Sequence, residues 1–427
     1  MTMTDRPLWR KALPDPPALR YTVHGGTNRW REWPRAWSGL LDTAGEDIVL
    51  GFEAEAARRC GMRHAVAFGA GRMALYAIAG ALGLREGDEV VLPGFTCTVV
   101  PNAFAYRGVR AVYADIDPVT FNVDPARVEP LITPRTRAIY LQHTFGQACD
   151  VEALRAIART RGLLTIEDAA HSFGATLAGR PHGSFGDAAF VSTDRTKVVN
   201  THLGGFATTN DDALAARLRT ARERAMPAGT ARRIAFTFLA EFVLRQPAVL
   251  WIGRPALGAL RRAGLAFQWS DELMDRLPEG YPYPCGMSAM QARVGLTQLA
   301  ALDENLRHRR RLARWLEERI AWNTPSRLVG AFDEQAWLRY SFLVRDREEF
   351  VRRFGARIDL GIWFPTVLFG RETGTEAMGY TPGDCPVAEK VARHIVNLPT
   401  HPRIPLALYE SLWRRHGEWL RSQLVRV

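Results

Sequence analysis

The sequence is poor in cysteine and lysine, and long hydrophobic runs are missing. Its 427 residues include five cysteines, which are scattered, odd in number and never spaced as CxxC. This pattern excludes a disulfide scaffold, argues against a zinc site and favours a reducing compartment. A run of about eighteen apolar residues, as needed to cross a bilayer, does not occur. The first residues, MTMTDRPLWRKALPDPP, lack a signal-peptide core, so we expect a cytoplasmic protein without a bound metal.

The shortage of lysine makes each remaining lysine informative. Of 56 basic residues only three are lysines, namely Lys11, Lys197 and Lys390. Base composition of the genome explains the shortage itself, but an arginine cannot replace a lysine as an amine nucleophile or in a Schiff base. Lys11 falls in an expected N-terminal arm and Lys390 on the polar face of an expected helix. Lys197 follows a strand and a polar turn, and this position singles it out.

The remaining composition is that of a globular protein. Hydrophobic residues make up 47% and charged residues 24% of the chain, which excludes a disordered or collagen-like protein. The net charge is +11 at pH 7. Such a charge suits an anionic small-molecule substrate, and in the absence of a DNA or RNA motif we expect no nucleic acid as a partner.

Short apolar strands and amphipathic helices alternate between residues 51 and 225. Helical crossovers between buried strands predict an α/β fold with a mainly parallel central sheet covered by helices on both faces. Helices are expected at 51–60, 71–83, 98–108, 125–132, 151–162 and 211–224. In open sheets of this kind ligands bind at the carboxyl ends of the strands, so functional residues should follow the strands directly.

The pattern divides the chain into four parts. We expect an N-terminal arm (1–50), a large domain (51–225), an apolar and basic insertion (226–286) and a smaller α+β C-terminal domain (287–427). In the last part the pattern predicts a long helix from Met287, and a short strand at 361–364. It further predicts a strand at 337–345 and helices at 347–356, 385–398 and 406–422.

The insertion combines large apolar residues with an excess of arginine. Residues 232–262 contain six arginines and one acid, Glu241, and prolines at 247 and 255 interrupt them. The favoured interpretation is a helical excursion that packs on its own protein or on a second subunit. The alternative is an amphipathic segment that gives the protein a peripheral contact with an anionic membrane surface.

Candidate functional residues occur in four short segments. A Gly-rich turn, FGAGRMAL (68–75), opens a helix whose free N–H groups suit a phosphate, although many helices begin after glycine. Asp168 and His171 follow a strand in IEDAAH, where a cap or a core histidine is the ordinary alternative. Ser192 and Lys197 lie in STDRTK, which could also be a surface turn. Cys97, in LPGFTC, fits a small packed side chain better than a nucleophile.

Taken in order, these segments resemble one family. The succession of the Gly-rich turn, GDEVVLPGFT, DIDPVTFNVD, H-x-x-GQ, IEDAAH, S-x-x-x-x-K and GG-F-x-T-x-D is similar to that of the DegT/DnrJ/EryC1/StrS sugar aminotransferases. The resemblance runs from 51 to 224 and resumes at MSAMQARVGLTQLAALDE and LPTHPRI. It implies a fold-type I architecture, pyridoxal phosphate (PLP) as cofactor, an amino-acid donor, by analogy L-glutamate, and a homodimer.

The resemblance also implies roles for individual residues. Lys197 stands where the family has the lysine that holds the cofactor aldehyde as a Schiff base. Asp168 stands where a carboxylate pairs with the pyridine nitrogen, which an ionised acid keeps protonated. Ser192 matches a hydroxyl that holds the cofactor phosphate, and His171 lies near its phenolic oxygen. The backbone N–H groups that hold the same phosphate match Gly71, Arg72 and Met73.

The sequence departs from the family pattern at three places. Arg72 replaces the usual threonine of the phosphate turn, and Cys97 replaces the aromatic residue that stacks on the cofactor ring. In GYPYPCGM, Pro284 and Gly286 stand where the family has an asparagine that contacts the partner subunit's phosphate and an arginine. These changes place the cross-subunit contact and the stacking contact in question.

The resulting expectation is a PLP-dependent aminotransferase that converts a keto sugar, nucleotide-linked or lipid-linked, to an amino sugar. One alternative is another PLP-dependent sugar reaction such as dehydration. The dehydratases of the family carry histidine where this chain has Lys197. A second alternative is a degenerate enzyme that serves as a binding or assembly partner.

Overall fold

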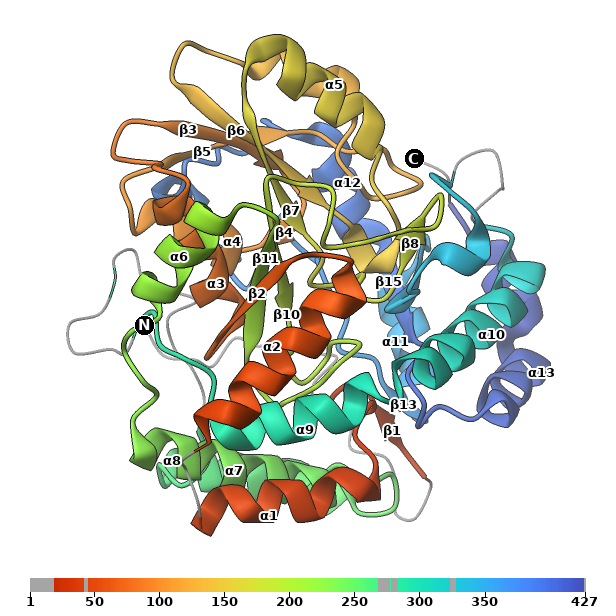
Figure 1. The fold of residues 1–427 in the computed structure, drawn as a ribbon. Coiled ribbons are helices and arrows are strands. Elements are labelled where there is room, and N and C mark those ends of the chain that lie inside the picture. The colour runs from red at the N-terminus through yellow and green to blue at the C-terminus, as the bar shows by residue number, and fades with distance from the viewer. Residues whose placement is uncertain (1–18, 42–44, 268–276, 278–282, 323–327, 426–427) are drawn as a thin grey trace.

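The computed structural model describes residues 19–41, 45–267, 277, 283–322 and 328–425. Within these residues a seven-stranded sheet has the order β2-β11-β10-β7-β6-β3-β5 (Figure 1). In that sheet β11 runs antiparallel to β10 and β2, and the remaining neighbours are parallel. The predicted mainly parallel sheet is confirmed. The strands are β2 (His64–Phe68), β3 (Glu89–Pro93), β5 (Arg110–Ala114), β6 (Thr136–Gln142), β7 (Leu164–Asp168), β10 (Ala188–Ser192) and β11 (Gly205–Thr209).

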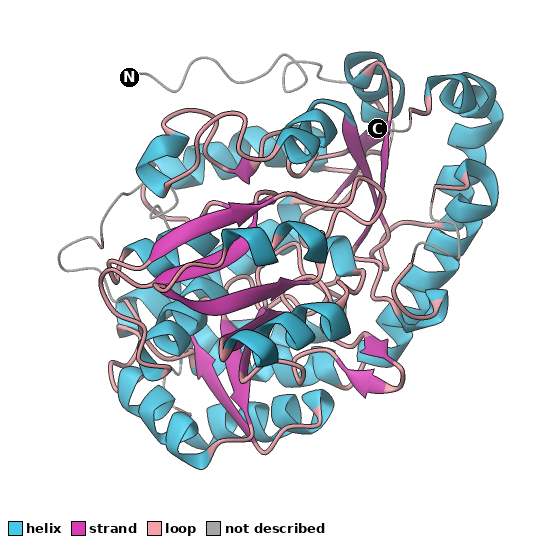
Figure 2. Ribbon diagram, turned by 90° about the horizontal axis from the view of Figure 1, so that it is seen from above, coloured by secondary structure: helices cyan, strands magenta, loops and turns pink. Residues whose placement is uncertain are grey.

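Helices cover both sides of the sheet, as the view from above shows (Figure 2). Their ends follow local sequence signals: Asp150 and Asp211 cap α5 and α6 by accepting from Ala153 N–H and Leu214 N–H, and α5 ends at Gly162 in the left-handed region. The helices are α2 (Glu46–Cys60), α3 (Gly71–Ala81), α4 (Val99–Ala105), α5 (Val151–Arg161) and α6 (Asp212–Ala221).

The C-terminal part packs helices around a small antiparallel pair of strands. β12 (Arg339–Leu343) pairs with β15 (Ile395–Pro399), and α10 lies against β12. Two short strands pair outside the main sheets: β13 (Ile358–Asp359) with β1 (Tyr21–Thr22), and β14 (Leu368–Phe369) with β4 (Thr96–Cys97). The helices are α9 (Ala289–Leu299), α10 (Leu302–Ile320), α11 (Arg347–Gly355), α12 (Pro386–His394) and α13 (Leu406–Gln423).

Two helix predictions need correction. The long helix expected from Met287 is divided into α9 and α10, because Ala301 has φ −105° and ψ 7°, outside the helical region. The helix expected over 385–398 ends at His394, and the β-branched residues after it form β15 instead.

Two short elements are also different from the expectation. The helix expected over 125–132 consists of two 3-10 turns, since prolines at 125 and 130 remove N–H donors from a continuous helix. The strand expected at 361–364 is a loop. Gly361 and Phe364 have φ of +46° and +57°, and such angles break an extended ladder.

The insertion forms a helical hairpin on the protein's own surface. We call residues 228–262 the α7–α8 hairpin, with α7 (Ala228–Leu244) packed against α1 (Trp33–Leu41) and against α8 (Leu250–Arg262). The two helices cross closely at Gly253, where an added Cβ would lie 1.8 Å from Leu244 O. The hairpin thus packs on its own protein, which is one of the two arrangements in the favoured interpretation of the insertion.

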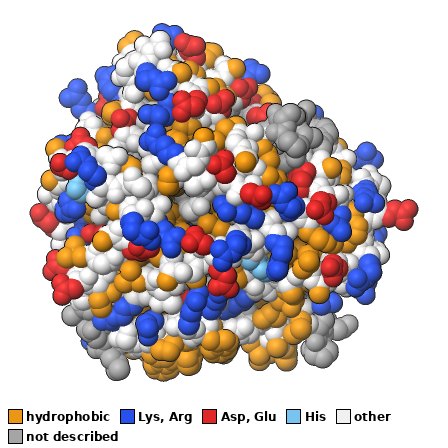
Figure 3. Space-filling view, turned by 45° about the vertical axis from the view of Figure 1, so that its right-hand side comes forward, with side chains coloured by type: hydrophobic (Ala, Val, Ile, Leu, Met, Phe, Trp, Pro, Cys, Tyr) orange, Lys and Arg blue, Asp and Glu red, His pale blue; other side chains and the backbone are white. Residues whose placement is uncertain are grey.

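Large apolar side chains are exposed along α1 and the hairpin. Figure 3 shows apolar side chains gathered along the lower edge of the molecule, at the level of these helices. Among the described residues, no helix is both long and apolar enough to cross a membrane. Parts of the predicted N-terminal arm and insertion, including Lys11, lie outside the described residues. The exposed residues include Trp37, Phe236, Val243, Trp251 and Ile252.

Candidate functional site

A cavity of about 770 Å³ lies at the carboxyl ends of the parallel strands. This volume is within the range of small-molecule sites, about 300–1,000 Å³. Residues of the large domain, the N-terminal segment, the hairpin and the C-terminal part all line it. It brings together seven of the residues singled out in the sequence, namely Gly71, Arg72, Cys97, Asp168, His171, Ser192 and Lys197.

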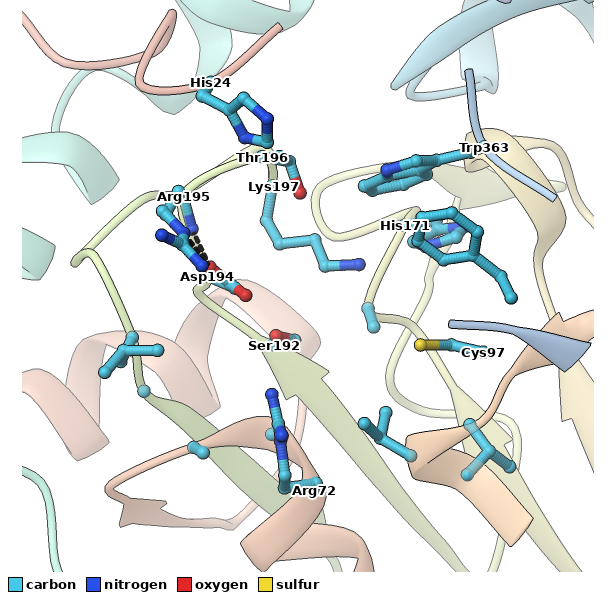
Figure 4. Close-up of a pocket in the computed structure, with 18 of the residues that line it drawn as sticks. His24, Arg72, Cys97, His171, Ser192, Asp194, Arg195, Thr196, Lys197 and Trp363 are labelled. Carbon is cyan, nitrogen blue, oxygen red and sulfur yellow. Dashed lines mark hydrogen bonds and ion pairs between the residues drawn. The ribbon is translucent and has the colours of Figure 1, made fainter. Parts of the chain in front are cut away.

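Lys197 lies in a loop after β10 that is clamped from two sides. The N-terminal segment holds it through Thr27 Oγ1, which donates to Lys197 O at 3.0 Å. From the other side Asn305 Nδ2 on α10 donates to Val198 O at 2.8 Å. The side chain of Lys197 therefore projects from a fixed backbone into the cavity, towards Trp363 (Figure 4). Burial lowers the pKa of its amine, although the nearby Asp194 and Asp168 oppose this shift.

Asp168 ends β7 and is buried at the bottom of the cavity. Its Oδ2 accepts from Tyr140 Oη at 2.7 Å, and its Oδ1 accepts from Ala170 N–H at 2.8 Å. Burial raises the pKa of the carboxyl, and these two donors work in the opposite direction. Each oxygen keeps acceptor capacity, so Asp168 can pair with a cationic group of a ligand. Tyr140 was not recognised in the sequence, because a tyrosine within a buried strand carries no distinct signal.

His171 is stacked on Trp363, with ring centroids 4.9 Å apart. Its Nδ1 accepts from Phe145 N–H at 3.2 Å, which leaves the proton on Nε2. Burial, together with the charge of Lys197, holds the pKa of His171 well below its usual range, so the ring is neutral. The Nζ of Lys197 lies over the ring of Trp363, 4.7 Å from the ring centroid. Trp363 lies in the loop that the sequence predicts to be a strand.

The turn before α3 approaches Ser192 very closely. A Cβ added at Gly71 would lie 2.7 Å from Ser192 Cβ, so only glycine allows this approach. The first N–H groups of a helix lack partners within it, and here the first residues of α3, Gly71 and Arg72, line the cavity together with Ser192. Met73 does not line the cavity: its side chain is fully buried, and its N–H donates to Ala70 O at 3.1 Å. A contact of this N–H with a phosphate stays a prediction.

The structure shows the surroundings of two departures from the family pattern, Cys97 and the segment 283–286. Cys97 ends β4 on the side of the cavity where Trp363, Phe364 and Phe369 supply aromatic rings. The segment 283–286 packs on the turn before α3 of its own chain: Tyr283 Oη donates to Arg72 O at 3.1 Å. Gly69 N–H donates to Cys285 O at 2.8 Å. Residues 280–282 of the GYPYPCGM segment lie outside the described part of the chain.

The hairpin supplies one wall of the cavity, which the sequence did not predict. Arg245 at the end of α7 and Arg261 and Arg262 at the end of α8 line it, together with Arg195 and His24. Arg195 stands between Ser192 and Lys197 in STDRTK, so its position in the sequence could have indicated that it lies near the cavity. The arginines of the hairpin had no such signal, because only the fold brings them near Lys197.

Comparison with known proteins places the chain in a family. The model of the DegT/DnrJ/EryC1/StrS aminotransferase family matches residues 36–410. GDP-perosamine synthase of Caulobacter vibrioides is 36% identical over 274 residues, 64% of this chain and 62% of that protein. Spore coat polysaccharide biosynthesis protein SpsC of Bacillus subtilis is 30% identical over 83% of this chain and 85% of its own length.

A solved structure of similar fold is that of DesV from S. venezuelae in complex with a ketimine intermediate. It is 27% identical, has a TM-score of 0.72, and the match covers 96% of this chain and all of that one. The sheet, the cavity at its carboxyl edge and these matches agree with one another. The chain belongs to the DegT/DnrJ/EryC1/StrS aminotransferase family, whose members are fold-type I enzymes that depend on pyridoxal phosphate.

Proposed function

We propose that this protein transfers an amino group from an amino acid, L-glutamate by family analogy, to a keto sugar carried on a diphosphate-linked group. The observation that carries this proposal is the meeting of a buried lysine amine, a buried carboxylate and a helix N-terminus with a serine hydroxyl in one cavity. A Schiff-base cofactor that is also a phosphate ester and a pyridine needs this combination of groups.

The residues present fit pyridoxal phosphate. The close approach of Gly71 to Ser192 leaves a cradle of N–H and hydroxyl donors, which suits a phosphate. Asp168 retains acceptor capacity for a protonated ring nitrogen, and Lys197 supplies the amine. Arg72 lines the same side of the cavity and adds positive charge where the family has a threonine. The bound cofactor supplies an electron sink for carbanion chemistry.

Lys197 is assigned as the proton carrier of the reaction. Burial lowers the pKa of its amine, so more of it is unprotonated near neutral pH than for an exposed lysine. Such an amine can hold the cofactor aldehyde, and once displaced by the substrate amine it can remove and return the proton at the substrate carbon. Its clamped loop limits the positions that the Nζ can take.

Asp168 and His171 are assigned to two different polar groups of the cofactor, the ring nitrogen and the phenolic oxygen. Ionised Asp168 would keep the ring nitrogen protonated and stabilise negative charge that develops in the reaction. The neutral His171, with its proton on Nε2, can donate a hydrogen bond to a phenolic oxygen. Trp363, stacked on His171, provides the aromatic surface that Cys97 does not.

The remaining predictions on partners extend this proposal. A homodimer is expected because the family's sites lie between subunits, and the exposed apolar side chains of α1 and the hairpin fit a protein contact. The contact of residues 232–262 with a membrane surface stays a prediction, as does a cytoplasmic location. Against the dehydratase alternative stands Lys197, and against a degenerate enzyme stand the intact Lys197 and Asp168.

The test is covalent trapping of the cofactor. Protein purified with pyridoxal phosphate should absorb near the Schiff-base wavelength, and borohydride should fix the cofactor on a single peptide that contains Lys197. L-Glutamate should then convert the cofactor to its aminated form in a single turnover. Protein that takes up no cofactor would remove the proposal and favour a degenerate binding protein.

A further inference from the structure

The α7–α8 hairpin directs a cluster of arginines to the cavity. Arg195, Arg245 and Arg261 all place a guanidinium nitrogen near one oxygen, Glu241 Oε1, at 3.3, 3.0 and 2.9 Å. Burial works against ionisation of Glu241, but Arg245 and Arg195 outweigh it and hold its pKa well below its usual range. The carboxylate therefore fixes three guanidinium groups around one point.

Among the described residues, the cluster has more basic than acidic groups. Counting Arg262, which also lines the cavity, four guanidinium groups stand against two carboxylates, Glu241 and Asp194, within the described part of the chain, a difference of two charges. Arg245 is 7% exposed, so its charge is not screened as it would be at the surface, whereas the Arg261 side chain is 32% exposed and Arg262 is exposed to solvent. A buried charge in such a cluster is costly unless it is compensated, which favours an anion as a further partner of Arg245.

Hydrogen-bond donors of the same arginines are also left over. The Nε–H groups of Arg245 and Arg261 are buried and have no partner among the residues that the structure describes. His24 also lines the cavity, and its Nδ1 is likewise buried without a hydrogen-bond partner among the described residues. Buried polar groups are normally hydrogen-bonded, so these atoms point to a ligand with several acceptor oxygens.

The cluster lies on one side of the Lys197 side chain. In Figure 4, Arg195 and Asp194 lie on the opposite side of Lys197 from Trp363, and Ser192 lies between them and Arg72. An anion on the cluster would therefore lie on the side of Lys197 that faces away from Trp363. Arg245, Arg261 and Arg262 belong to the hairpin, so this wall is a property of the insertion.

We propose that the α7–α8 hairpin forms a subsite for the diphosphate group of the acceptor substrate, held by Arg245, Arg261 and Arg262 together with Arg195. The inference deepens the proposed function and rests on it. A diphosphate that links a sugar to its carrier has about two negative charges on adjacent phosphorus atoms, which equals the charge difference among the described residues of the cluster. A single carboxylate of an amino donor would neutralise half of it. Guanidinium forks match phosphate oxygens in pairs.

Calorimetric titration of the holoenzyme with inorganic pyrophosphate tests the subsite directly. The cofactor's own phosphate then fills the cradle at Ser192, so binding reports the remaining cavity. We expect Arg261→Gln and Arg262→Gln each to weaken pyrophosphate binding by about tenfold or more, the loss of one charge-assisted contact. The matched control is Arg254→Gln, on the same helix but paired with Asp359 at 3.5 Å outside the cavity lining.

Two further measurements make the result decisive. Arg261→Lys keeps the charge and loses the fork, so partial recovery of binding separates a ligand contact from a folding defect. Geranyl diphosphate and GDP, titrated in parallel, identify a lipid or nucleotide carrier, and tighter binding of one of them still supports the subsite. Equal pyrophosphate binding by all variants, or none by the wild type, would overturn it.

The donor half-reaction distinguishes the subsite from a carboxylate site. Conversion of the cofactor by L-glutamate in a single turnover should be slowed much less than pyrophosphate binding is weakened in Arg261→Gln. An equal loss in both would assign the cluster to the donor carboxylate and end the proposal. If the wild type fails to react with glutamate yet binds pyrophosphate with the same arginine dependence, the proposed function fails while the subsite stands.

Discussion

The cavity has two walls, and each contains one buried carboxylate. On the wall formed by the strand ends, Asp168 receives only neutral donors, Tyr140 Oη and Ala170 N–H, and burial raises its pKa. On the hairpin wall, three guanidinium groups surround Glu241 and hold its pKa well below the usual range. The comparison shows that the neighbours, not burial itself, decide whether a buried acid costs or contributes stability.

The contributions of Glu241 and Asp168 to the free energy of unfolding should therefore change with pH in opposite directions. A carboxyl whose pKa is lowered on folding contributes stability above its unfolded pKa and loses it as the pH falls through the folded pKa. Glu241 follows this rule. A carboxyl whose pKa is raised on folding, as for Asp168 without cofactor, reduces stability as the pH rises above its unfolded pKa.

The largest effect is expected from the strand-end wall. Lys197→Ala removes both the amine that holds the cofactor and the proton carrier, so kcat should fall by about 10²–10⁴-fold or more. Single-turnover absorbance changes with L-glutamate measure this loss. Lys390→Ala, on the helix α12, is the matched control and should leave turnover unchanged. Equal turnover of Lys197→Ala and wild type would exclude the assigned mechanism.

Asp168→Asn sharpens the comparison because it separates activity from stability. Loss of the charge beside the cofactor should reduce kcat by about 10²–10³-fold, the usual effect of removing one electrostatic contact to the transition state. In the cofactor-free protein the same change removes a poorly compensated buried charge. The free energy of unfolding at pH 7 should then rise by about 1 kcal/mol. Urea unfolding of the cofactor-free proteins checks the sign, and a loss of stability would contradict the role given to burial.

Glu241→Gln tests the opposite prediction on the hairpin wall. It leaves three guanidinium groups without their acid, and breaking a buried pair costs about 3–5 kcal/mol. The deficit at pH 7 should begin to shrink below about pH 4, where the unfolded wild type takes up a proton at Glu241, and should vanish only as the pH falls through the lowered pKa of the folded state. Urea unfolding at both pH values measures this. The control is Glu304→Gln, an exposed acid paired with Arg29 at 2.6 Å, for which less than about 1 kcal/mol is expected.

Gly253→Ala should disturb the hairpin wall alone. The added Cβ would meet Leu244 O at 1.8 Å, so α7 and α8 must separate, at a cost of about 1–3 kcal/mol. Pyrophosphate binding should weaken more than the glutamate half-reaction, because the arginines move while Lys197 stays clamped. Gly229→Ala, where an added Cβ meets nothing within 4 Å, is the control. A loss confined to the glutamate half-reaction would contradict the division into two walls.

The strand-end wall was predictable from the sequence and the hairpin wall was not. Asp168, Ser192 and Lys197 follow strands directly, so the α/β rule places them at one edge of the sheet. Arg245 and Arg261 stand in a helical segment whose apolar pattern predicts only packing. Their approach to the cavity depends on the crossing of two helices at Gly253, which is a property of tertiary contact.

Other differences from the sequence pattern have similarly local causes. Trp363 lies in a loop with positive φ values on both sides of it, where an apolar run predicts a strand. The N–H of Met73, which the turn pattern assigns to a phosphate, donates to Ala70 O in the structure. Sequence patterns therefore located the residues of the strand-end wall. The residues of the hairpin wall and of the loop around Trp363 depend on tertiary contacts and backbone angles that these patterns do not encode.

The smallest predicted effect concerns Tyr140. Its neutral hydroxyl donates to Asp168, whereas charged guanidinium groups surround Glu241. Burial raises the pKa of Tyr140 well above its usual range, so its Oη remains a donor to Asp168. Tyr140→Phe should raise the pKa of Asp168 further and move the acid limb of the kcat/KM profile to higher pH, with a loss of about 1 kcal/mol in stability. Tyr113→Phe, which breaks a 2.7 Å bond to Met378 O away from the cavity, should cost similar stability and leave the profile in place. An unshifted limb in Tyr140→Phe would mean that the cofactor nitrogen alone controls Asp168.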